Sequence, residues 1–132
     1  MRNIIAAITI TAGLVGCAHV KRDEAQYRDD TRSLLESRNA QIKSCYDNML
    51  ASDSSASGTV TVNFVVEKKT GVVTNVAVNP EQTQAPAALQ TCVVRALDGL
   101  VLTPEDRKTG EATFTWVFRP GASASGGSEA AF

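Results

Sequence analysis

The chain has few of the residues from which most active sites are built. Its 132 residues include a single histidine, His19, and three cysteines. Neither a Ser/His/Asp arrangement nor metal-ligand spacing is visible, and the acidic residues are scattered, so no catalytic residue, bound metal or cofactor is expected. The sequence therefore predicts a protein that is not an enzyme.

Long runs of one residue type are also missing. The 13 basic and 14 acidic residues form no block of like charge, so no electrostatic footprint for nucleic acid is present. The longest apolar stretch, Ile4 to Val15, is about 12 residues, whereas a membrane-spanning helix needs about 20. These absences argue against nucleic-acid binding and against a transmembrane span.

The apolar stretch follows Arg2 and has the length of the hydrophobic region of an export signal. It ends in LVGC at positions 14–17, which resembles the bacterial lipobox. The resemblance implies that residues 1–16 are a lipoprotein signal peptide and that Cys17 is acylated. Acyl chains would then anchor the protein in the outer membrane, facing the periplasm rather than the cell surface. An ordinary signal peptide or a short buried helix are the alternative interpretations.

If Cys17 carries a lipid, Cys45 and Cys92 are the single intramolecular pair that remains in an oxidising compartment. Their disulfide would close a loop of about 48 residues and stabilise the fold by roughly 4 kcal/mol. A redox pair or a metal site is the alternative, but the sequence has no C-x-x-C motif. We therefore predict a structural disulfide, which suits a domain with a small core.

Composition divides the rest of the chain into three parts. Residues 17–28 are polar and aperiodic, which is typical of a tether. Residues 29–120 show helix and strand periodicity and predict one small domain. Residues 121–132 are mainly Gly, Ser and Ala, so a disordered tail is expected there.

Helical and strand periods alternate within the domain. The expected elements are a helix from about 29 to 50, a β-hairpin over 59–79, a helix beginning near 86, and a strand over 111–118. A hairpin followed by a helical crossover returns the third strand beside the first. The predicted fold is α+β, in the order α-β-β-α-β, with a three-stranded antiparallel sheet of order 2-1-3 and two helices on one face.

Four segments together resemble one known family. They are IKSCYDNML at 42–50, GTVTVNFVVEKKTGVVTNVAVNP at 58–80, LQTCVVRAL at 89–97 and ATFTWVFRP at 112–120. They are similar to the AgmX/PglI C-terminal domain, a relative of the TonB C-terminal domain. The resemblance implies a paired Cys45 and Cys92 and a role in an envelope complex, such as gliding motility machinery. Without an inner-membrane helix and a Pro-rich spacer, the chain is not expected to transduce energy as TonB does.

TonB relatives bind an extended peptide along a sheet edge, and this resemblance favours β-strand addition as the function. The expected open edges are residues 111–118 and 72–79, with Thr113, Thr115 and Val117 as candidate partner-binding residues. We predict a lipid-anchored interaction module with an envelope protein partner. The alternatives are a passive structural or peptidoglycan-associated lipoprotein, and edges that are merely blunted by short length and polar flanks.

Overall fold

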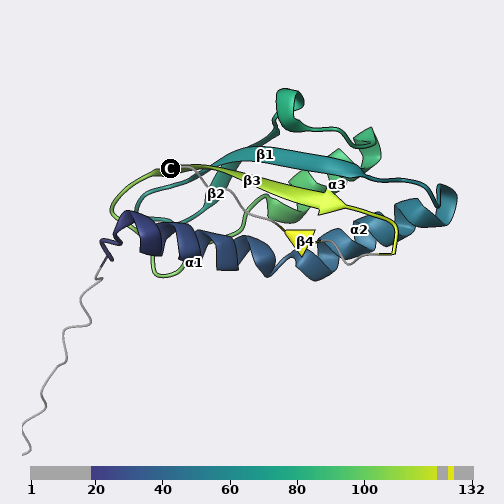
Figure 1. Ribbon diagram of the computed structural model, residues 1–132. Helices are drawn as coiled ribbons and strands as arrows, with labels where there is room; N and C mark the ends of the chain where they lie inside the picture. Colours follow the sequence, from purple (N-terminus) through teal and green to yellow (C-terminus); the bar gives the residue numbers. More distant parts are fainter. Residues whose placement is uncertain (1–18, 122–124, 127–132) are drawn as a thin grey trace, which may run out of the picture.

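The computed structural model describes residues 19–121 and 125–126 (Figure 1). In chain order the elements are α1 (Glu24–Glu36), α2 (Asn39–Ser52), β1 (Gly58–Val66), β2 (Val73–Val78), the 3-10 helix η1 (Pro80–Gln82), α3 (Ala87–Leu97), β3 (Gly110–Phe118) and β4 (Ser125–Gly126). The strands form one antiparallel sheet of order β2-β1-β3-β4, and Figure 1 shows α1, α2 and α3 on one side of it. The predicted α+β fold and the strand order 2-1-3 are confirmed, and the short β4 is added outside β3.

The predicted tether at 17–28 is wrong from Val20 onward. Val20 forms a parallel bridge with Asp106 in the loop before β3. Arg22 is only 4% exposed, and α1 already begins at Glu24. Polar composition concealed this docking, because the residues that make it are a buried ion pair and a helix cap rather than an apolar stripe.

The predicted first helix is two helices separated at Ser37. The carboxylate of Asp23 caps α1 by accepting a hydrogen bond from the backbone N–H of Gln26 at 2.8 Å. In the first turn of α2, the side-chain oxygen of Asn39 accepts a hydrogen bond from the indole N–H of Trp116 at 3.3 Å. A fully buried tryptophan needs such an acceptor, so the start of α2 is tied to β3.

The core lies between the sheet and the helices. The inward-facing residues of β1 and β3 are buried: Val60, Val62, Phe64 and Val66, and Ala112, Phe114, Trp116 and Phe118. The helices cover them with Leu35, Ile42 and Tyr46, and with Leu89, Val93, Ala96 and Leu97. Each fully buried valine, leucine, isoleucine or phenylalanine contributes about 1.5–3 kcal/mol, so this layer stabilises the sheet whose edge is β3.

Cys45 of α2 and Cys92 of α3 form the predicted disulfide, with their Cα atoms 6.1 Å apart. Both residues are half-buried. The bond joins the two helices that cover the sheet, and the pairing is the one expected from the sequence.

β1 and β2 form the predicted hairpin. Gly71, between these strands, allows residues 100–102 to approach the chain closely. Gly71 has a φ of 67°, and a Cβ atom there would lie 2.1 Å from the carbonyl oxygen of Leu102. This close approach lets residues 100–102 pair with β2. The N–H of Val73 donates to the carbonyl of Leu100, and the N–H of Leu102 donates to the carbonyl of Gly71, both at 2.7 Å. The outer edge of β2 is therefore covered at its start.

Candidate functional site

The outer edge of β3 presents main-chain hydrogen-bonding groups. On the side of β1 away from β3, the N–H of Thr61 donates to Thr83 Oγ1 at 3.0 Å, and the carbonyl of Thr61 accepts from the same hydroxyl at 3.2 Å. In an antiparallel pair, two opposite residues both face each other or both face away. Thr115 is opposite Thr61, so its N–H and C=O point away from β1. Thr113 and Val117 lie two residues to either side and point the same way.

Part of that edge is occupied by the chain itself. The two residues of β4 pair with Trp116 and Val117. The predicted disordered tail at 121–132 is therefore wrong at residues 125 and 126, because strand pairing needs main-chain groups and not apolar side chains. The other residues of that tail after Gly121 lie outside the described residues. Within the described part of the chain, no strand pairs with the outer side of residues 111–115.

The side chains of Thr113, Thr115 and Val117 are half-buried on the face of the sheet opposite the helices. Thr113 Oγ1 donates to Asn63 Oδ1 at 2.8 Å, and the hydroxyls of Thr115 and Thr61 are 2.9 Å apart. These cross-strand hydrogen bonds fix the threonine rotamers in the free protein. An added strand would therefore meet an ordered surface, which lowers the entropy cost of binding.

A hollow of about 410 Å³ lies on this open face next to the free part of the edge. Asn63, Asn75, Glu111 and Thr113 border it. Asn75 has a φ of 53° and sits where the register of β1 and β2 shifts, which marks a β-bulge. The hollow is suited to a polar side chain of a segment that pairs with β3.

A buried ion pair fixes the segment that precedes α1. The backbone N–H of Arg22 donates to Asp106 Oδ2 at 2.9 Å, and Arg22 Nη1 lies 3.6 Å from the same oxygen. Burial by itself raises the pKa of Asp106, but hydrogen bonds from the backbone N–H groups of Arg22 and Lys108, with the guanidinium charge, hold that pKa below its ordinary value. Sequence reasoning missed this pair because its members are far apart in the chain and both lie in polar stretches.

The structure adds little on the other candidate residues. Cys17 and the signal segment 1–16 lie outside the described residues. Within residues 19–121 and 125–126, no three His, Cys, Asp or Glu side chains are grouped as a metal site. No helix in that part has the length and apolar character needed to cross a bilayer. The absence of enzymatic activity stays a prediction.

The chain matches no protein-family model, no curated protein and no solved structure. The resemblance to AgmX/PglI C-terminal domains therefore also stays a prediction. What the structure defines is a small α+β domain with a strand edge that is partly paired and partly open, and the function is argued from that edge.

Proposed function

We propose that the protein is a lipid-anchored interaction module of the bacterial cell envelope that captures an extended segment of a partner protein along the outer edge of β3. The observation that carries this proposal is the pairing of β4 with Trp116 and Val117. Strand pairing uses main-chain groups, so an edge that pairs with a serine and a glycine offers the same hydrogen bonds to segments of other sequences. The same edge continues through Thr115 and Thr113, whose main-chain groups point outward.

The anchor in this proposal rests on the lipobox resemblance at Cys17. The domain begins to pair at Val20, three residues later. Three extended residues span only about 10 Å. A lipid on Cys17 would therefore hold the domain close to the membrane surface, where it would meet segments of other envelope proteins. Association with a motility or envelope complex is supported by the family resemblance alone.

A proline substitution tests the edge. Thr113→Pro removes an outward N–H and leaves the hydrogen bonds between β1 and β3 in place, because residue 113 does not donate to β1. Thr113→Val is the matched control, since it keeps the N–H and loses only the hydrogen bond to Asn63. The tagged full chain is crosslinked mildly in its own cells and then isolated, after circular dichroism has shown that both variants fold.

We expect a defined protein partner with the wild type and with Thr113→Val, and its loss with Thr113→Pro. Equal recovery of that partner with Thr113→Pro contradicts the proposed edge. Retention of the wild type with the peptidoglycan sacculus, without a protein partner, supports the alternative of a passive wall-associated lipoprotein.

A further inference from the structure

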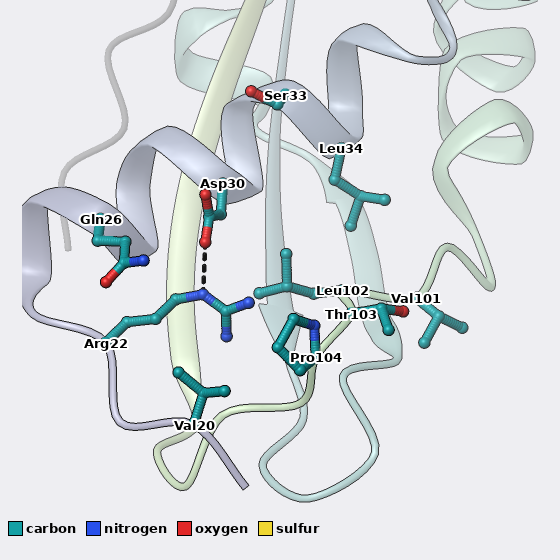
Figure 2. Close-up of a pocket in the computed structure, with 10 residues that line it drawn as sticks. All are labelled: Val20, Arg22, Gln26, Asp30, Ser33, Leu34, Val101, Leu102, Thr103 and Pro104. Carbon is teal, nitrogen blue, oxygen red and sulfur yellow. Dashed lines mark hydrogen bonds and ion pairs between the residues drawn. The ribbon is translucent and has the colours of Figure 1, made fainter. Parts of the chain in front are cut away.

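A groove of about 720 Å³ lies between α1 and the segment that follows α3 (Figure 2). Val20, Leu34, Leu102 and Pro104 form its apolar walls, and Arg22 and Asp30 lie at one end. No residue of β3 lines it. The groove is thus separate from the edge on which the proposed function rests.

The guanidinium of Arg22 does not use all of its N–H groups in hydrogen bonds. Its side chain is 2% exposed, and Nε donates to Asp30 Oδ2 at 2.6 Å. Nη1 is buried and lies 3.6 Å from Asp106 Oδ2, an ion-pair contact, but it donates no hydrogen bond among the described residues. Figure 2 shows the guanidinium directed into the groove, toward Leu102 and Pro104. A buried donor without an acceptor costs about 1–3 kcal/mol, so an acceptor placed in the groove would be favoured.

Charge decides which acceptor fits. Arg22 already lies next to two carboxylates, those of Asp30 and Asp106. An incoming carboxylate would gain one guanidinium and face two like charges at short range, which is unfavourable. A neutral acceptor such as a peptide carbonyl has no such cost.

The opposite end of the groove offers a free strand residue. Val101 is opposite Val72 in an antiparallel bridge, and the hydrogen bonds of that bridge are made by the residues on either side of Val101. The N–H and C=O of Val101 therefore point away from β2. Among the described residues they have no hydrogen-bond partner. The side chain of Val101 is 44% exposed, the largest exposure of any large hydrophobic residue described.

We propose that this groove binds an extended, uncharged peptide segment of a partner protein. The main chain of the peptide pairs with Val101, one of its carbonyls accepts a hydrogen bond from Arg22 Nη1, and a branched apolar side chain packs against Leu34, Leu102 and Pro104. This second site does not depend on the proposed β3 edge. It adds a residue-specific contact that main-chain pairing along β3 does not supply.

Two capped heptapeptides test the proposal on the isotope-labelled full chain with its disulfide intact. The neutral probe is Gly-Thr-Val-Ile-Val-Thr-Gly, and in the acidic probe aspartate replaces both valines. Amide exchange and chemical shifts are followed by NMR. We expect the neutral probe to slow exchange of the Val101 amide at least tenfold and to shift the Arg22 side-chain N–H signals. The acidic probe should bind at least tenfold more weakly.

Three variants make the test specific. Val101→Pro removes the free N–H and should weaken binding of the neutral probe at least tenfold, whereas Val101→Ala keeps that N–H and should weaken it less. Thr113→Pro should leave binding of this probe unchanged, even where it abolishes partner capture. If Val101→Pro fails to fold, protection of the Val101 amide in the wild type decides the matter. Protection at Thr113 and Thr115 instead of Val101, or equal binding of the acidic probe, overturns the proposal.

Discussion

The backbone N–H of Arg22 and the carboxylate of Asp106 are joined by a hydrogen bond of 2.9 Å, although they lie 84 positions apart in the chain. The contact ties the residues before α1 to the loop before β3. Asp106 is 1% exposed, so water does not stabilise its negative charge. Hydrogen bonds from the backbone N–H groups of Arg22 and Lys108, together with the Arg22 guanidinium, do so instead. The position of Arg22 at the end of the groove depends on that charge.

Replacing Asp106 by Asn should lower the free energy of unfolding by about 3 kcal/mol, because the buried guanidinium loses its buried partner and keeps only the partly exposed Asp30. Urea unfolding measures the change. Glu105→Gln is the matched control, since the neighbouring Glu105 is half-buried and forms no ion pair among the described residues. Similar midpoints for the two variants would contradict a stabilising role for the Asp106 charge.

Acid should weaken the same contact in the wild type. A carboxyl whose pKa is lowered by folding stabilises the folded state above its unfolded pKa of about 3.9, and that contribution is lost as the pH falls through the lower folded value. The free energy of unfolding should therefore fall more steeply below about pH 4 in the wild type than in Asp106→Asn. Parallel pH profiles for the two proteins would show that Asp106 does not carry this dependence.

Loss of the disulfide should cost about 4 kcal/mol, from the entropy of a loop whose ends are 47 positions apart. Cys45→Ala, Cys92→Ala and the double variant all remove the same bond, so their unfolding free energies should agree closely. Chemical denaturation of the three proteins checks this. Additive losses in the double variant would mean that each cysteine contributes chiefly through its own packing.

Alanine substitutions at Gly71 and Gly99 distinguish the cost of backbone strain from the cost of a steric clash. Gly71 and Gly99 have φ values of 67° and 76°, so alanine is strained at both. Only at Gly71 does an added Cβ meet another residue, the carbonyl of Leu102 at 2.1 Å, whereas nothing lies within 4 Å at Gly99. Gly71→Ala should cost about 1–3 kcal/mol more than Gly99→Ala and should speed amide exchange at Val73. Equal costs would rule out the close contact with Leu102.

Deleting residues 122–132 should lengthen the open edge of β3, because Trp116 and Val117 lose their pairing with β4. Unpaired edges associate with one another. The truncated chain should therefore self-associate at lower concentration than the full chain, which sedimentation velocity measures. Adding Thr113→Pro to the truncated chain should reverse the effect. Identical sedimentation of full and truncated chains would show that β4 does not protect this edge.

The sequence predicted the structure correctly where hydrophobic periodicity or the number of cysteines determined it. Alternation in Val60–Val66 predicted β1, and the pairing of Cys45 with Cys92 followed from the assignment of Cys17. α1 was placed too late because the positions that it buries before Leu35 include Thr31, which interrupts the apolar stripe. β4 was missed because serine and glycine pair through the main chain and leave no hydrophobic pattern.

Because β4 pairs with Trp116 and Val117, it competes with any partner segment for these two residues of the β3 edge. Six residues link Phe118 to Ser125, and a connection this short gives an intramolecular segment an effective concentration in the millimolar range. A foreign strand that extends along β3 as far as Trp116 and Val117 must displace β4, which competes at that concentration. At these two residues, a segment that offers only main-chain hydrogen bonds is therefore disfavoured, whereas a ligand that also binds residues 111–115 gains contacts that β4 does not make.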